Sequence, residues 1–136
     1  MIDDLQATLT SWRRHLHANP GLTLEEGPTA AFVVQKLREM GVTEITDNFG
    51  GHGVVATIRR AGGNRSVGLR GDMDALPMPE DTGLDFASKV DNVMHACGHD
   101  THVAMLAGAA KMLSERKATL PGRVLFMFQP GEEGYG

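Results

Sequence analysis

The stretch Val124-Leu125-Phe126-Met127-Phe128, followed by Gln129-Pro130-Gly131-Glu132-Glu133, decides the fold of this chain. Its first five residues are all apolar, so an extended backbone would place apolar side chains on both of its faces. Such a strand is typical of the middle of a sheet that is covered on two sides. The sequence therefore predicts a central strand over 123–129 with two adjacent carboxylates directly after its carboxyl end.

Helical and extended segments surround this strand. Apolar residues at helical spacing predict three helices: about 2–18, 27–40 with Gly41 as a left-handed cap, and about 99–113. Shorter segments predict three more strands: 42–46, 53–59 and 66–70. The last two are joined by a turn over 61–64 and are expected to form a returning pair. Residues 78–96 show no period and predict a long loop. This order predicts an α/β fold, a layered domain with a mixed sheet.

Composition excludes several classes of protein. The 136 residues are 41% hydrophobic and 22% charged with a net charge of -4, and no Lys/Arg-rich run supports a nucleic-acid or anionic-membrane partner. Asp3, Asp4, Arg13 and Arg14 interrupt the N-terminal segment, which excludes a secretory signal core. No apolar run approaches the roughly 20 residues that span a bilayer. Cys97 has no partner for an internal disulfide, so a reducing, cytoplasmic location is expected.

Chemistry-bearing residues fall where such a sheet places its ligands. In open α/β sheets, ligands gather beyond the carboxyl ends of the strands. Three groups of polar residues are expected at that edge: Asp72 with Asp74 after one strand, Glu132 with Glu133 after another, and Cys97 with His99 before a helix. The sequence therefore predicts that segments far apart in the chain converge on one site.

The run Met94-His95-Ala96-Cys97-Gly98-His99-Asp100-Thr101-His102 holds a thiol, three imidazoles and a carboxylate. Gly98 allows a bend through which Cys97 and His99 can face one ion. A cysteine alone is more often a small buried apolar residue, but its neighbours here favour a metal site. Thiolate and imidazole suit zinc, and carboxylates tolerate manganese.

Two pairs of carboxylates have alternative interpretations. Glu132 and Glu133 could be a solvated pair, or one could bind metal while the other acts as general base toward water. Asp72 and Asp74 could bind backbone amides, or orient a metal-bound imidazole, for which Asp74 is the preferred candidate. His15 and His17 are expected on a helix surface and His52 in a structural turn; His95 and His102 are candidates only for supporting a ligand.

Four motifs carry a family resemblance: Arg14–His17, Leu69–Pro77, Met94–Asp100 and Phe128–Glu133. Together they span nearly the whole chain. The sequence resembles the metal-dependent amidohydrolases of the aminoacylase and carboxypeptidase group, above all the branch of hippurate hydrolase and the indole-acetyl-amino-acid amidohydrolases. It departs at Gly131, where many relatives have alanine.

The resemblance implies a zinc-exopeptidase-like catalytic domain. Cys97, His99 and Glu133 would bind metal, and Glu132 would be the general base; Asp74 is the second expected catalytic residue. Two divalent ions, zinc or manganese, would share the water that cleaves the amide bond of an N-acyl amino acid. Residues 1–136 would be the N-terminal part of this domain. The two remaining histidine ligands and an inserted domain for dimerisation and substrate closure would lie beyond it, and the full-length protein would be a homodimer.

Two other interpretations remain open. In the first, Cys97 is the nucleophile of a thiol hydrolase; alkylation would then inactivate it, chelation would not, and Glu132 and Glu133 would have no role. In the second, the 136-residue piece is not catalytic, because three protein ligands cannot satisfy two ions. It would then simply fold, or dimerise through exposed sheet edges.

Overall fold

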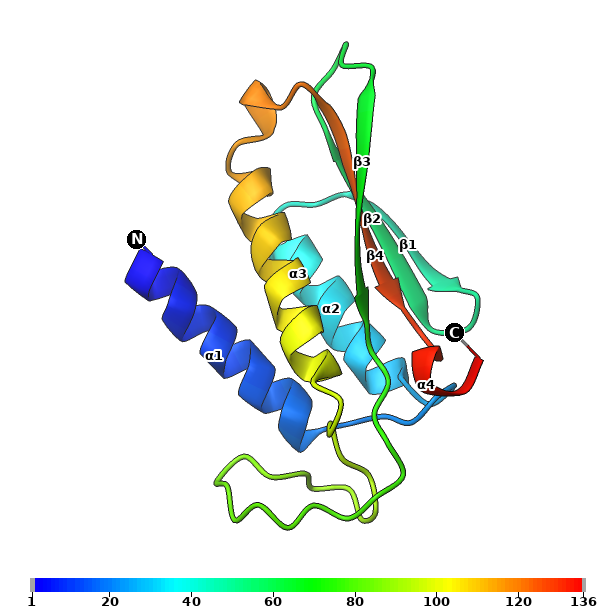
Figure 1. Ribbon diagram of the computed structural model, residues 1–136. Coiled ribbons are helices and arrows are strands. Elements are labelled where there is room, and N and C mark those ends of the chain that lie inside the picture. Colours follow the sequence, from blue (N-terminus) through cyan, green and yellow to red (C-terminus); the bar gives the residue numbers. More distant parts are fainter. Residues whose placement is uncertain (1, 136) are drawn as a thin grey trace.

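A computed structural model describes residues 2–135 and shows helices on one side of a four-stranded sheet (Figure 1). Gly136, the last residue of the terminal Gly134-Tyr135-Gly136, lies outside the described residues. The helices are α1 (Ile2–Ala18), α2 (Gly27–Glu39), α3 (His99–Ser114) and the single turn α4 (Glu132–Tyr135), with a 3-10 turn at Lys117–Thr119. The strands are β1 (Glu44–Phe49), β2 (Gly53–Arg59), β3 (Arg65–Asp72) and β4 (Gly122–Gln129). The α/β class and the mixed sheet are thus confirmed.

The strand order is β1-β2-β4-β3, with β4 antiparallel to β2 and parallel to β3. The central position of β4 is therefore confirmed. The expected returning pair is wrong as a pair of neighbours: β3 does reverse direction after β2, but β4 lies between them. The turn residues over 61–64 indicate only that the chain reverses direction. Which strands become hydrogen-bonded neighbours depends on which strand buries the most apolar surface. Phe126 and Phe128 give β4 that advantage, at 0% and 1% exposure.

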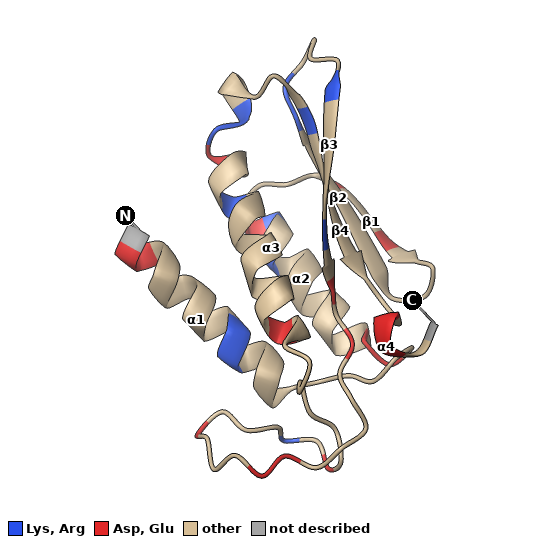
Figure 2. Ribbon diagram, in the orientation of Figure 1, with Lys and Arg blue, Asp and Glu red and all other residues tan. Residues whose placement is uncertain are grey.

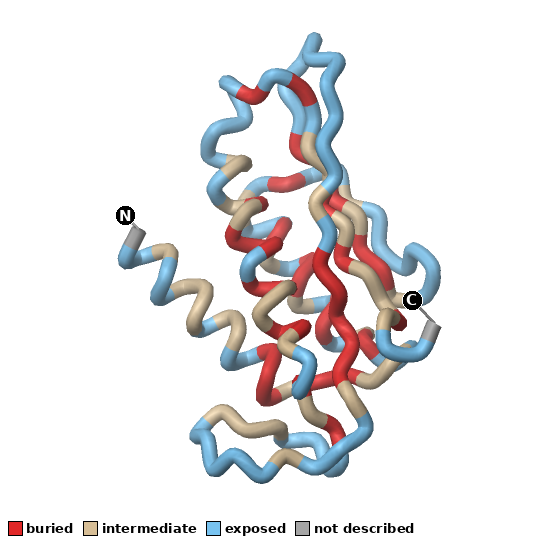
Figure 3. The backbone as a smooth tube through the Cα atoms, viewed as in Figure 1, coloured by how far each residue is buried: buried red, intermediate tan, exposed pale blue. Residues whose placement is uncertain are grey.

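The helices cover only one face of the sheet within the described residues. Phe126 and Phe128 belong to the hydrophobic core, together with buried residues of α2 and α3. Figure 3 shows the buried residues gathered where the sheet faces the helices. Leu125 and Met127, on the opposite face of β4, are only partly buried. The expected cover on both faces of β4 is thus wrong for residues 2–135, because all three long helices pack on the same side.

Two glycines set the ends of helices. Gly41 has a φ of 82°, and the amides of Gly41 and Val42 bond to carbonyls of the last turn of α2, as the predicted cap requires. Because Val42 belongs to this cap, the strand predicted over 42–46 begins only at Glu44. Gly98 has a φ of 83° and precedes the first residue of α3, His99.

The connection from β3 to α3 has no helix or strand over 78–96, as predicted. An isolated β-bridge joins Met94, inside this loop, to Leu76, which lies just before it. It carries the chain from the end of β3 to the start of α3. The strand β4 ends at the same end of the sheet (Figure 1). Among the helices described, none is long and apolar enough to cross a bilayer.

Candidate metal centre

Carboxylates and imidazoles meet where β3 ends and where α3 and α4 begin. Figure 2 shows acidic residues at these points, whereas lysine and arginine gather toward the opposite end of the sheet. Asp72 is the last residue of β3, His99 the first of α3 and Glu132 the first of α4. The predicted convergence of three segments on one edge is therefore present in the structure.

His99 lies at the middle of this group and is 2% exposed. Its Nδ1 is 2.8 Å from the carbonyl oxygen of Asp74, and since a carbonyl only accepts, Nδ1 donates and Nε2 keeps a free lone pair. Three carboxylate oxygens surround Nε2: Asp72 Oδ2 at 3.3 Å, Glu132 Oε2 at 3.5 Å and Glu133 Oε1 at 3.6 Å. Ligands about 2.1 Å from one tetrahedral ion lie roughly 3.4 Å apart, so each of these oxygens lies at a separation from Nε2 that fits a cation shared by the two atoms.

The sequence-predicted ligands are brought together. Donor atoms of Cys97, His99 and Glu133 all lie within 4.8 Å of one another. Two further groups meet the same distance criterion, Asp74–His99–Glu132 and Asp72–His99–His102. A thiol, an imidazole and several carboxylates form a donor set that suits borderline divalent metals such as zinc and manganese. Every group includes His99, so the three candidate groups overlap at one imidazole.

Cys97 is an exposed thiol beside Glu133. A hydrogen bond with Glu133, together with burial and the charges of neighbouring carboxylates, raises the pKa of this thiol. The thiolate is the nucleophilic form of cysteine, so a raised pKa disfavours attack on a substrate. A coordinated metal ion instead deprotonates a thiol directly.

Asp74 is fully buried and holds the start of α4. Its Oδ1 is 3.2 Å from the amide nitrogen of Glu132, and its Oδ2 is 2.9 Å from that of Glu133 and 2.7 Å from Thr23 Oγ1. The carboxylate thus binds backbone amides, one of the two alternatives open from the sequence. The closest contact that orients His99 comes from the carbonyl of Asp74, with Oδ1 farther away at 3.4 Å.

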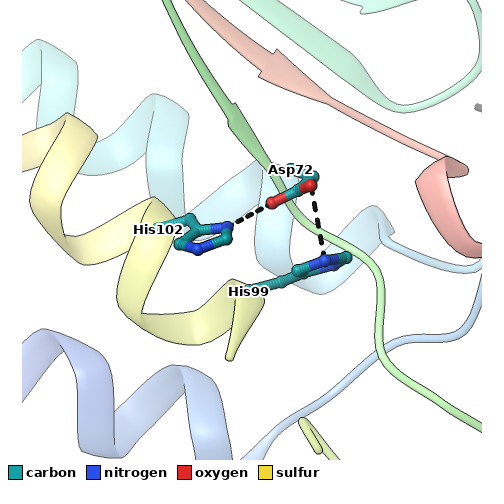
Figure 4. A group of neighbouring side chains, drawn as sticks. All are labelled: Asp72, His99 and His102. Carbon is teal, nitrogen blue, oxygen red and sulfur yellow. Dashed lines mark hydrogen bonds and ion pairs between the residues drawn. The ribbon is translucent and has the colours of Figure 1, made fainter. Parts of the chain in front are cut away.

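Asp72 joins two imidazoles, as Figure 4 shows. Its Oδ1 accepts from His102 Nδ1 at 2.6 Å, while Oδ2 faces His99 Nε2. Burial raises the pKa of Asp72, but the hydrogen bond from His102 and the positive charges nearby, that of Arg70 among them, outweigh it, and the net shift is downward. Sequence reasoning gave this residue less weight than Asp74. The available signal was the spacing of His99 and His102, which lie three apart on one helix face.

Glu26 supports the same site and was not singled out from the sequence. It is completely buried, and its Oε1 is 2.9 Å from the amide of Leu24 and 3.0 Å from the amide of Gly131. The buried carboxylate of Glu26 therefore fixes the turn that precedes Glu132, through the amide of Gly131. No periodicity marks Glu26, which simply precedes Gly27-Pro28 at the start of α2.

The remaining histidines differ in their surroundings. His15 is exposed and stacks on Phe32, as expected for the helix surface. The surface expectation for His17 is wrong: it is 3% exposed and lies between the carboxylates of Asp100 and Glu80. His95 is also buried; burial lowers its pKa to about 4, and neither ring nitrogen has a hydrogen-bond partner among the described residues.

Fold and site together define an α/β domain with a cluster of candidate metal ligands at the carboxyl edge of its sheet. Residues 68–136 match Peptidase family M20/M25/M40, and the chain belongs to this family. It is 42% identical to an N-acyl-L-amino acid amidohydrolase of Geobacillus stearothermophilus over 98% of this chain and 36% of the relative. It is 44% identical to a hippurate hydrolase of Campylobacter jejuni over 98% of this chain and 34% of that enzyme. The resemblance seen in the sequence motifs is confirmed.

A solved structure agrees with the fold. The YXEP protein of Bacillus subtilis, described as a dinuclear metal-binding peptidase of the M20 family, superposes with a TM-score of 0.91 at 42% identity. The alignment covers 96% of this chain and 36% of that protein. The chain therefore spans about a third of the length of these relatives.

Proposed function

We propose that this chain is the N-terminal part of the catalytic domain of a metal-dependent hydrolase that cleaves the amide bond of N-acyl amino acids. The observation that carries the proposal is the free Nε2 of His99, with carboxylate oxygens of Asp72, Glu132 and Glu133 at 3.3–3.6 Å. Relatives named as an N-acyl-L-amino acid amidohydrolase and a hippurate hydrolase support the substrate class.

The proposed metal ligands are Cys97, His99 and Glu133, which would hold two divalent ions, zinc or manganese, together with ligands from elsewhere in the full-length protein. When bound, such ions polarise the scissile carbonyl and lower the pKa of a bound water toward neutrality. The hydrogen bond from His99 Nδ1 to the carbonyl of Asp74 fixes the ring and leaves Nε2 available to hold an ion, as metal-bound histidines generally require.

Glu132 is the proposed general base. Its side chain is 36% exposed, so its carboxylate can reach both solvent and a substrate, while its backbone is held by Asp74. In this position it would take a proton from the attacking water and return it to the leaving amine. Asp74 would contribute by keeping Glu132 and Glu133 in fixed positions.

The wider assembly is part of the same proposal. Three side-chain ligands cannot complete two coordination shells, so we expect the 136-residue chain alone to be inactive. The full-length protein would be a cytoplasmic homodimer with an inserted domain, acting on small N-acyl amino acids without a nucleic-acid or membrane partner.

The test is hydrolysis of hippurate and of a panel of acetyl-amino acids by the full-length protein, with zinc or manganese added. We expect turnover that is lost on exhaustive chelation and returns with added metal. Undiminished turnover after chelation would overturn the metal mechanism. Inactivation by alkylation under those conditions would point to Cys97 as nucleophile, the alternative that its raised pKa disfavours.

A further inference from the structure

His17 joins three segments that lie far apart in the sequence. It is the penultimate residue of α1, and its Nδ1 lies 2.8 Å from Asp100 Oδ2 in the first turn of α3. Its Nε2 lies 3.0 Å from Glu80 Oε1 in the loop over 78–96. Both ring nitrogens of His17 therefore have a carboxylate oxygen within hydrogen-bond distance.

The imidazole and the two carboxylates of this group are sealed from solvent. The side chains of His17, Glu80 and Asp100 are exposed by 3%, 3% and 0%, and Arg13 Nε adds a second donor 2.8 Å from Asp100 Oδ2. Buried carboxylates are tolerated when donors compensate them, and removing one donor leaves an uncompensated charge. The contacts are therefore mutually dependent, and we call these four residues the His17 clamp.

The start of α3 has no side-chain N-cap. Its N-cap residue is Gly98, which offers no side chain to bond the free amides of the first turn. Asp100 stands in this turn, but its Oδ2 bonds outward to Arg13 and His17 on α1. The residue directly before Asp100 is His99, whose ring must be aimed with some precision. Contacts to Asp100 therefore fix the backbone from which His99 projects.

We infer that His17 is a positioning residue for the metal centre: through Asp100 it fixes the first turn of α3, and through Glu80 it ties the adjoining loop to the same point. This inference rests on the proposed function, because it concerns the site that would bind the ions. It gives the Arg14–His17 motif, which the catalytic chemistry does not use, a defined role.

The loop contact strengthens this assignment. Glu80 also accepts the amide of Ser88 at 2.9 Å, so one carboxylate closes the loop on itself while bonding to His17. The ring of Phe86 lies edge-on to His17, with the guanidinium groups of Arg13 and Arg14 4.9–5.0 Å from its centroid. The loop that leads to Cys97 is thus seated on α1 around His17.

The test compares His17→Gln with His15→Gln in the full-length protein. The control removes an exposed imidazole from the same helix. The readouts are zinc affinity, from competition with a chromophoric chelator, the melting temperature of the metal-free protein, and kcat and KM separately. For His17→Gln we expect zinc affinity to fall about tenfold or more, the lower end of what loss of a ligand-supporting contact produces. We expect kcat to fall with KM little changed, and no change for His15→Gln.

Further variants keep the inference falsifiable if His17→Gln folds poorly. Glu80→Gln removes only the loop contact and should weaken zinc binding less than His17→Gln does. Asp100→Asn and the double variant complete a cycle; if His17 acts through Asp100, the double variant binds zinc no more weakly than the worse single variant. A folded His17→Gln protein with wild-type zinc affinity, or fully additive losses, would overturn the inference. A wild-type protein that binds zinc but hydrolyses no N-acyl amino acid would instead refute the proposed function.

Discussion

Asp74 Oδ2 lies 2.9 Å from the backbone nitrogen of Glu133, and this bond connects the end of one strand to the turn after another. The same carboxylate bonds to the amide of Glu132, and the carbonyl of Asp74 bonds to His99. One buried residue thus sets the relative positions of the proposed base and two proposed ligands. A metal centre assembled from separate segments needs such a link, because ligand positions off by about an ångström lose much of their catalytic value.

Replacing Asp74 tests this link. In Asp74→Asn, the amide group of the new side chain must face one of the two backbone N–H donors, since asparagine has a single acceptor oxygen. We expect the free energy of unfolding of the metal-free protein to fall by about 1–3 kcal/mol, and zinc affinity to fall with it. Urea denaturation and chelator competition measure the two effects. Asp85→Asn, in the exposed loop, is the control, and equal losses in both variants would contradict the role given to Asp74.

Gly98 lies between the two proposed ligands Cys97 and His99, and its backbone is left-handed, with a φ of 83°. Alanine would fit sterically, because the nearest atom, Thr101 Oγ1, is 3.7 Å from the added carbon, but its backbone would be strained by about 1–2 kcal/mol. Relief of this strain moves the ligands, so we expect Gly98→Ala to weaken both stability and zinc binding. Gly83→Ala has the same kind of strain, at a φ of 68° in open space, and should weaken stability alone. Unchanged zinc affinity in Gly98→Ala would argue against a metal role for this turn.

The fold was predictable as far as local periodicity reaches. The helix and strand segments, the cap at Gly41 and the central position of β4 all follow from apolar spacing and glycine. The insertion of β4 between β2 and β3 does not, because pairing is decided by burial across the whole sheet. The site divides in the same way. The two glutamates come directly after a strand, and Cys97 and His99 lie at the start of a helix, so their convergence could be predicted. The burial of His17 could not, because it depends on carboxylates supplied by distant segments.

Glu132 and Glu133 differ in expected role, and glutamine at each position separates the two. Glu132→Gln removes the proposed base, so we expect kcat to fall by about 10²–10⁴-fold with metal content unchanged. Glu133→Gln removes a proposed ligand, so we expect metal content and activity to fall together. Metal analysis of the purified variants beside steady-state kinetics distinguishes them. The opposite pattern would exchange the two assignments.

The reactivity of Cys97 discriminates between a metal ligand and a nucleophile. Its pKa is raised from the ordinary value of 9.0, chiefly by the hydrogen bond with Glu133, so little thiolate is present at neutral pH in the metal-free protein. We expect slow labelling by iodoacetamide near pH 7 and acceleration only at more alkaline pH. Glu133→Gln should speed labelling, because it removes the neighbouring negative charge, and bound zinc should block it. Rapid labelling of the metal-free protein at neutral pH would revive the thiol-hydrolase interpretation.

Glu80 gives the His17 clamp a measurable acid dependence. Burial raises the pKa of Glu80, but the hydrogen bonds from Thr82, Ser88 and His17 outweigh it, so its folded-state pKa lies below the ordinary 4.5. Between these two values the unfolded chain binds more protons than the folded one. The stability due to ionised Glu80 is therefore complete above about pH 4.5 and is lost as the pH falls through the folded-state value.

The variant Glu80→Gln isolates this contribution. We expect wild type to exceed Glu80→Gln in free energy of unfolding by a constant amount from about pH 7 to about pH 5.5, with the difference shrinking below about pH 4.5. Urea denaturation at a series of pH values measures the difference. Glu115→Gln removes a carboxylate whose side chain is 64% exposed and paired with Lys111, and it should leave the curve nearly unchanged, as surface ion pairs do. A difference that stays constant down to about pH 3 would show that the ionised carboxylate of Glu80 is not what anchors the loop to His17.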